Sequence, residues 1–161
     1  MGVQCRRFQV PLLVGYLTWL PTERSIWNID FLIIHVGSNN IAIHQSVNQI
    51  ISFYGDLIHY IKWKTSAQIV FTSILPRLCD FHQTERMVTK VNVELKSLCK
   101  RRHISFSNIY RSFLYKNKPD PSLFAPKDHL HLNFSGTALL RKKLFINSGV
   151  ASIEAMRQLP Y

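Results

Sequence analysis

Cysteine is scarce in this sequence. The 161 residues include three, Cys5, Cys79 and Cys99. An odd number at these spacings fits neither a disulfide framework nor a zinc-binding motif. We therefore expect reduced, partly buried thiols, which favours an intracellular location over a secreted one.

Long hydrophobic runs are also missing. The apolar stretch from Phe8 to Leu20 has thirteen residues, whereas a transmembrane helix needs about 20. A short basic leader precedes this stretch, as in a signal peptide, but Pro11 interrupts it and no small-residue cleavage site follows. We therefore expect no membrane span and do not favour a signal peptide.

Acidic residues are few, at 9 against 20 Lys and Arg, which gives a net charge of +11. Such an excess favours an acidic partner, for example nucleic acid or an anionic membrane surface. Only Lys100 to His103 and Arg141 to Lys143 are tight clusters, and both lie near ends of predicted helices, where cations stabilise the helix dipole. Neither cluster has interleaved aromatic residues. We therefore favour a solvated face, with nucleic-acid binding as the alternative.

The apolar residues that are present predict one domain with a substantial core, because they make up 47% of the chain. Two runs without alternation, Phe31 to Val36 and Gln68 to Leu75, predict strands buried on both faces, and the first suits the centre of a parallel sheet. A shorter strand is predicted over 104–107. A loop of about twenty residues follows it, and loops of that length are commonly functional.

Apolar residues at three- and four-residue intervals predict helices between and after these strands, over 45–64, 85–102 and 135–145. Asn133 and Ser135 are both suitable caps for the last helix. Strands and helices alternate, an order that generates a parallel sheet with right-handed crossovers. We therefore predict a three-layer α/β/α sandwich.

Polar residues with catalytic chemistry lie at two places. Asp128 and His131 are spaced so that the carboxylate can accept from one ring nitrogen, which leaves the other nitrogen free to take a proton from a hydroxyl. Asn39 follows the first strand, where its amide can donate to an oxyanion. Each piece alone is more typical of a capped helix start or a simple turn. His129 and His131 lack further ligands at the spacing of a metal site.

Taken together and in this order, these segments resemble the SGNH (GDSL-type) hydrolases. His35-Val-Gly-Ser-Asn-Asn40 resembles the third conserved block of that family, usually Gly-x-Asn-Asp, and Asp128-His-Leu-His131, followed by Leu132-Asn133 and Gly136, resembles the fifth. Phe71 to Arg77, and Val91-Asn92 with Leu95 and Cys99, also resemble a branch often found in transposon-derived reading frames. The resemblance covers residues 29 to 145.

The resemblance implies a flavodoxin-like α/β/α sandwich that acts on a small ester. It makes Asn39 an oxyanion-hole donor, His131 the general base and Asp128 the residue that orients it. No metal or organic cofactor is implied.

The nucleophile block of the family, Gly-Asp-Ser, is not found. Leu13 to Thr18 has a similar strand-then-glycine outline, but Tyr16 and Leu17 stand where Asp and Ser are needed. Gly15 matches instead the second-block glycine that joins the oxyanion hole, if the first block is absent. The hydroxyls considered as substitutes are those of Thr18, Ser25 and Ser38, and none lies in a nucleophile-bearing context.

The sequence therefore indicates a truncated or degenerate copy with little or no ester hydrolysis. We expect an N-terminal segment, 1–28, then an SGNH-like domain over 29–146 and a tail over 147–161. Residues 8–15 of the first segment suit either a remnant strand or a loop packed on the core. One alternative is a non-catalytic module of mobile-element origin whose basic surface binds nucleic acid. Another is a fragment with no independent fold.

Overall fold

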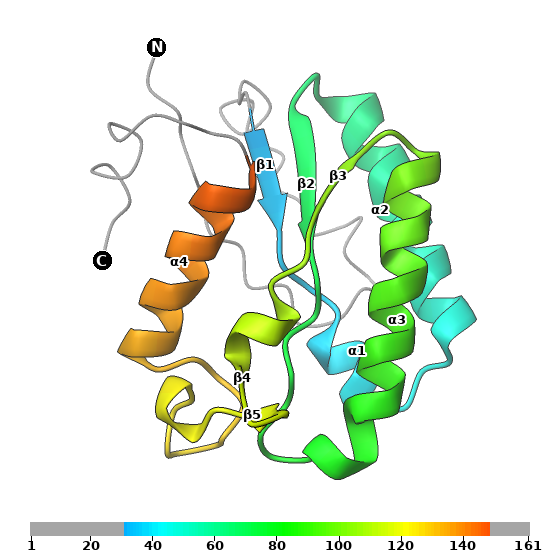
Figure 1. Ribbon diagram of the computed structural model, residues 1–161. Helices are drawn as coiled ribbons and strands as arrows, with labels where there is room; N and C mark the ends of the chain where they lie inside the picture. The colour runs from blue at the N-terminus through cyan, green and yellow to red at the C-terminus, as the bar shows by residue number, and fades with distance from the viewer. Residues whose placement is uncertain (1–30, 149–161) are drawn as a thin grey trace.

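A computed structural model of the chain describes residues 31–148 (Figure 1). Cys5, the remnant strand predicted at 8–15 with Gly15, the hydroxyls of Thr18 and Ser25, and most of the predicted tail lie outside the described residues.

Three parallel strands form the sheet: β1 (Phe31–Ile34), β2 (Gln68–Thr72) and β3 (Ser105–Ser107). Their order is β1-β2-β3, with Ile33 opposite Val70 and Phe71 opposite Phe106. Within the described residues β2 therefore lies between β1 and β3. Three of the four β1 residues are only half-buried. The central place that the sequence indicates for β1 stays a prediction, because residues 1–30 are outside the described range.

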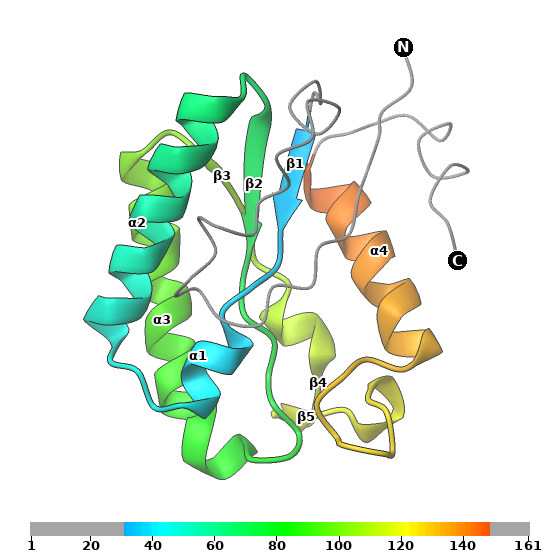
Figure 2. The same cartoon turned by 180° about the vertical axis from the view of Figure 1, so that it is seen from behind.

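Helices cover both faces of this sheet. Figures 1 and 2 show α2 (Val47–Lys64) and α3 (Phe81–Arg101) together on one side and α4 (Phe134–Ser148) on the other. The predicted three-layer α/β/α sandwich with a parallel sheet is confirmed. None of the described helices is long and apolar enough to cross a membrane.

The predicted helices occur with small shifts at their ends. Ser46 caps α2, accepting from the Gln49 amide while the Gln49 side chain accepts from the Ser46 amide. The third helix begins at Phe81, four residues before the predicted start. Phe81 and Thr84 are buried, and the Thr84 hydroxyl donates to the Asp80 carbonyl at 3.0 Å. Burial of Phe81 and Thr84, together with this hydrogen bond, stabilises a first turn of α3 that the apolar pattern of the sequence did not indicate.

The segment predicted as a long loop is folded. It contains two short 3₁₀ helices, η3 (Tyr110–Phe113) and η4 (Pro121–Leu123), and a hairpin of β4 (Leu114–Tyr115) and β5 (Lys118–Pro119). Phe113 and Phe124 are buried and pack with Leu75, Ile109 and Leu140 in a second core cluster. The segment is held by a few buried residues rather than by a continuous apolar face, so its sequence shows no periodic apolar pattern.

Candidate functional site

A hydrogen bond joins the Asp128 and His131 side chains. His131 Nδ1 lies 2.7 Å from Asp128 Oδ2, while Asp128 Oδ1 accepts from the amides of Leu130 and His131 at 2.9 Å each. His129 adopts a φ of 53°, which lets the chain fold back over the carboxylate. The hydrogen bonds from these two amides, with that of the His131 ring, lower the pKa of Asp128. The carboxylate therefore stays ionised and fixes the imidazole.

The start of α4 holds this loop in place. The Asn133 side-chain oxygen accepts from the Gly136 amide at 2.9 Å, so Asn133 is the cap, and its amide nitrogen donates to the carbonyls of Ser122 and Phe124. At Gly136 a side chain would overlap the Leu123 carbonyl. Asn133 thus caps α4 and bonds to the preceding loop, and Gly136 lets the helix backbone approach the Leu123 carbonyl closely.

Asn39 lies in a short helix, α1 (Ser38–Ala42), and its side chain is exposed. Gly37 precedes it with a φ of 107°, a conformation that favours glycine. Asn40 is buried, and its amide donates to Gln45 Oε1 at 2.6 Å. The sequence predicted a turn here. The two asparagines of the motif differ in the structure, because Asn39 is exposed whereas Asn40 is buried and bonded to Gln45.

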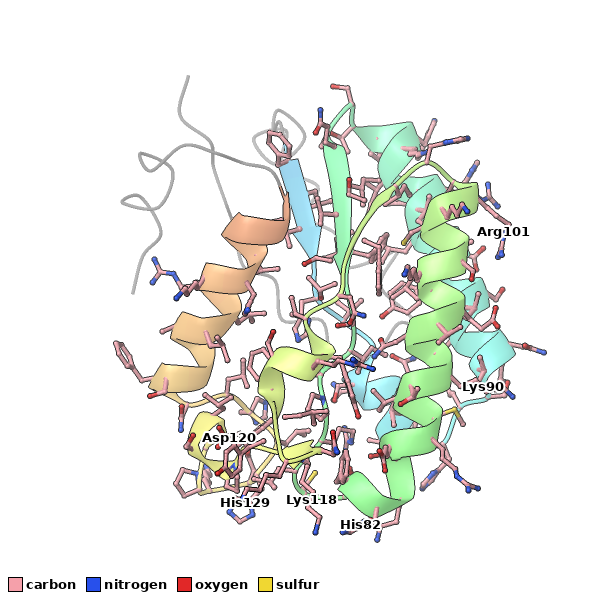
Figure 3. All side chains as sticks on the ribbon, in the orientation of Figure 1. His82, Lys90, Arg101, Lys118, Asp120 and His129 are labelled. Atoms are coloured by element: carbon pink, nitrogen blue, oxygen red, sulfur yellow. The ribbon has the colours of Figure 1, made fainter. Side chains whose placement is uncertain are left out.

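A buried arginine connects the two motifs through the loop that follows β2. Arg77 Nη1 donates to the backbone oxygen and the hydroxyl of Ser38, at 2.9 Å each, and the guanidinium pairs with Asp80 at 2.7 and 2.8 Å. Two residues on, the Cys79 amide donates to the His129 carbonyl at 3.0 Å. Asn39 and His131 therefore flank the same few residues at the carboxyl edge of the sheet, the end at which Figure 3 labels His129.

Burial opposes ionisation of Asp80, but its hydrogen bonds and charge interaction with Arg77 outweigh that effect and lower its pKa. The pair stays ionised, and a buried charge without its partner is strongly destabilising. Arg77 therefore fixes the position of Ser38, the neighbour of Asn39.

Asn92 of α3 fixes the same loop from the other side. Its side-chain oxygen accepts from the Ile74 amide at 2.7 Å, and its nitrogen donates to the Ile74 carbonyl at 2.9 Å. Ser73 next to it accepts from the amides of Ile109 and Tyr110 at 3.0 Å. The side chains of Asn92 and Ser73 thus add to the backbone hydrogen bonds that hold the loop after β2.

The hydroxyl and thiol groups near this edge are poorly suited to nucleophilic attack. The Ser38 hydroxyl is held by the Arg77 guanidinium at 2.9 Å. Cys79 is an exposed free cysteine, but burial of its sulfur and then the Asp80 charge raise its pKa, which disfavours the reactive thiolate. Cys99 is also free, and burial raises its pKa to about 11.

His35 and a groove between α2 and α3 lie apart from this pair. His35 follows β1, and its Nδ1 lies 2.6 Å from the Thr72 hydroxyl. Among the described residues no three His, Cys, Asp or Glu side chains are grouped to hold a metal. A groove of about 550 Å³ runs between α2 and α3, and it is lined by Asn48, Ile51, Ser52, Gly55, Asp56, His59, Glu94, Leu98 and Arg102.

Sequence reasoning named Asp128, His131 and Asn39 but gave no role to Arg77, Asp80 or Asn92. A signal for the first two was present, since an arginine and an aspartate three residues apart directly follow a buried strand. Asn92 was part of the segments that resemble the family, but its role could not be predicted, because its partner is backbone 18 residues away.

Comparisons with known proteins bear on the fold. No protein-family model and no curated protein sequence matches the chain. Solved structures do match it. A GDSL-like lipase from Bacteroides thetaiotaomicron is 17% identical with a TM-score of 0.63, and the match covers 76% of this chain and 62% of the other. A lipolytic G-D-S-L family protein from Veillonella parvula is 15% identical with a TM-score of 0.65, covering 83% and 70%.

A third similar structure is the esterase domain of the ORF1 protein from a zebrafish retrotransposon. It is 24% identical with a TM-score of 0.55, and the match covers 72% of this chain and 66% of the other. This chain spans only 62% of the length of the Bacteroides protein. Identities this low establish the fold alone. The chain therefore has the SGNH (GDSL-type) hydrolase fold that its motifs indicated.

Proposed function

We propose that this chain is an SGNH-type esterase-like domain that keeps the acid–base pair of the family and has little or no ester hydrolysis of its own. The observation that carries the proposal is the 2.7 Å hydrogen bond between His131 Nδ1 and Asp128 Oδ2. It leaves the second ring nitrogen available, on a side chain that is 63% exposed. The exposed imidazole can therefore meet a substrate.

The residues would divide the chemistry of an intact active site as follows. A hydroxyl attacks the ester carbonyl carbon, and His131 Nε2 takes its proton and passes it to the departing alcohol. Asp128 holds the ring through Nδ1 and stabilises its charged form. The side-chain amide of Asn39 donates to the oxyanion, an interaction whose loss typically costs about 2.7 to 4 kcal/mol in the transition state. Water then releases the acyl group.

The attacking hydroxyl is the part for which the chain offers no clear residue. The sequence contains no Gly-Asp-Ser, and the Ser38 hydroxyl is already paired with Arg77. A base without a nucleophile to activate gives little acceleration, because the covalent route through an acyl-enzyme is closed.

A small ester remains the substrate class that the proposal assigns to this site. The similar structures include a lipase, a lipolytic protein and an esterase domain. The esterase domain comes from a retrotransposon, and this supports a mobile-element origin for the chain.

Hydrolysis of p-nitrophenyl acetate tests the proposal. We expect the wild-type chain to turn over no faster than His131→Ala, since both lack a working nucleophile. His129→Ala is the matched control, because it removes a neighbouring imidazole that has no carboxylate partner among the described residues. Turnover abolished by His131→Ala and kept by His129→Ala, with both variants folded by circular dichroism, would overturn the expected inactivity.

A further inference from the structure

A second surface lies at the opposite end of the strands, where α2 and α3 finish. We define the basic pole as the side chains at these two helix ends: Tyr60, Lys62, Trp63, Lys64, Lys100, Arg101, Arg102 and His103. Figure 1 shows both ends at the top of the molecule, near the starts of β2 and β3, and Figure 3 labels Arg101 there. The Asp128–His131 loop lies at the other edge.

Two contacts bring the helix ends together. Lys62 Nζ of α2 donates to the Arg102 carbonyl at 2.9 Å. His59 and Arg102 line the same groove between the helices, and Trp63 follows His59 by one helical turn, on the same face. The aromatic residues that the cluster at Lys100 to His103 lacks in sequence are therefore supplied by the neighbouring helix.

Trp63 is the feature that helix stability does not explain. Its side chain is 70% exposed, the ring of Tyr60 lies edge-on to it at 6.2 Å, and Lys64 Nζ lies 3.9 Å from its ring centre. Cations in a last helical turn stabilise the helix dipole, but an exposed indole does not. Lys64 Nζ lies over the indole ring, and an exposed aromatic ring among cationic side chains is the kind of platform on which single-stranded bases stack.

No ion pair involves the basic pole among residues 31–148, where the carboxylates in such contacts are Asp80 with Arg77 and Asp128 with His131. The five Lys and Arg side chains of the pole, all exposed, are thus left without a carboxylate partner among the described residues. The acidic residues Asp56 and Glu94 line the groove. Their negative charges would repel a nucleic-acid backbone that ran along the groove. A backbone that crosses the basic pole avoids them.

We infer that the basic pole binds single-stranded nucleic acid, with Trp63 stacking on a base and the lysines and arginines contacting phosphates. A duplex fits less well because its bases are already stacked on each other. The catalytic pair takes no part, so this function stands or falls independently of ester hydrolysis.

Fluorescence anisotropy of the full chain with labelled oligonucleotides tests the charge contacts. The probes are oligouridylate, oligothymidylate and a duplex, each about 15 nucleotides long, a length in the range of known single-strand sites. Lys100→Gln/Arg101→Gln/Arg102→Gln should weaken single-strand binding by about tenfold or more, and each lost phosphate contact should flatten the salt dependence by about 0.7 in log–log slope. Arg141→Gln/Lys142→Gln/Lys143→Gln is the matched control. It removes the same charge from α4 and should leave the affinity nearly unchanged.

A second pair of variants tests stacking. Trp63→Ala should weaken binding by about 5- to 100-fold without changing the salt slope, and Trp63→Phe should restore part of the loss. Tyr115→Ala is the control, because Tyr115 is 61% exposed with Lys116 Nζ 5.3 Å from its ring centre, yet belongs to β4. Single-strand affinity that RNA and DNA share supports the inference. No binding at low salt, equal losses from the two triple variants, or tighter duplex binding that ignores Trp63 would each overturn it.

Discussion

Gly37 turns the chain from β1 into α1 through a backbone conformation that other residues avoid. Its φ is 107°, and a Cβ there would lie 2.6 Å from the Tyr54 hydroxyl oxygen and 2.7 Å from Ile74 Cδ1. Tyr54 cannot move away easily, since it is buried and donates to the Val36 carbonyl at 2.6 Å. We expect Gly37→Ala to lower the free energy of unfolding by about 2 to 4 kcal/mol.

Gly55 is the matched control for that variant. It lies inside α2, and a Cβ there would meet nothing within 4 Å. Gly55→Ala should therefore raise the free energy of unfolding by about 0.5 to 1 kcal/mol. Urea denaturation of both variants measures the contrast, and equal effects on the two would contradict the geometry at Gly37.

The lowered pKa of Asp128 makes the free energy of unfolding depend on pH, with a sign that can be worked out. The Leu130 and His131 amides and the His131 ring lower the pKa of this carboxyl in the folded chain, whereas an unfolded aspartate has a pKa of about 3.9. The stabilisation is thus complete above the unfolded pKa and is lost as pH falls through the folded pKa. Carbon-detected NMR should give a titration midpoint for Asp128 below about 3.9. A midpoint above that value would mean that the loop does not hold the carboxylate as described.

At the scale of elements, the loop after β2 depends on one side chain of α3. Asn92 satisfies both backbone groups of Ile74. Asn92→Ala leaves those groups unpaired, and an unsatisfied buried group costs about 1 to 3 kcal/mol. We expect the Ile74 amide to exchange with solvent much faster in this variant.

The neighbouring Val93→Ala is the control, because Val93 is 58% exposed on the same helix and should leave Ile74 exchange unchanged. If both variants left exchange unaltered, the loop would owe its position to other contacts.

The elements that the sequence pattern predicted are those that present a continuous apolar face, such as α2 with Ile50, Tyr54, Ile58 and Ile61 buried. The elements it did not predict are short. They include α1, the β4–β5 hairpin and the first turn of α3, and each is too short to show a periodic apolar pattern in the sequence. The pairing of Asp128 with His131 was predictable because it is local. Arg77 with Ser38 was not, since 39 residues separate the partners.

At the scale of the molecule, two core clusters interlock the layers. One joins the sheet to α2 and α3, and the other packs residues of the β3–α4 segment with Leu140 of α4. The alternation of strands and helices was enough to predict this architecture, but the order of the strands required the structure. The basic pole required it as well, because its aromatic and cationic residues come from different helices.

Both core clusters contain residues from the segment after β2, Ile74 in one and Leu75 in the other, so the described residues should unfold as one unit. We expect a single cooperative thermal transition, with the same midpoint by far-ultraviolet circular dichroism and by near-ultraviolet circular dichroism. A gradual loss of signal without a transition would instead favour a fragment that does not fold alone.

Labelling with a fluorophosphonate, followed by intact mass spectrometry, tests most directly the central claim that a formed Asp128–His131 pair has no nucleophile to activate. Such a probe forms a covalent adduct with a serine whose proton a neighbouring base removes. We predict no more adduct on the wild-type chain than on His131→Ala. A stoichiometric adduct on one serine of the wild-type chain, absent from His131→Ala, would contradict the claim and identify a working esterase.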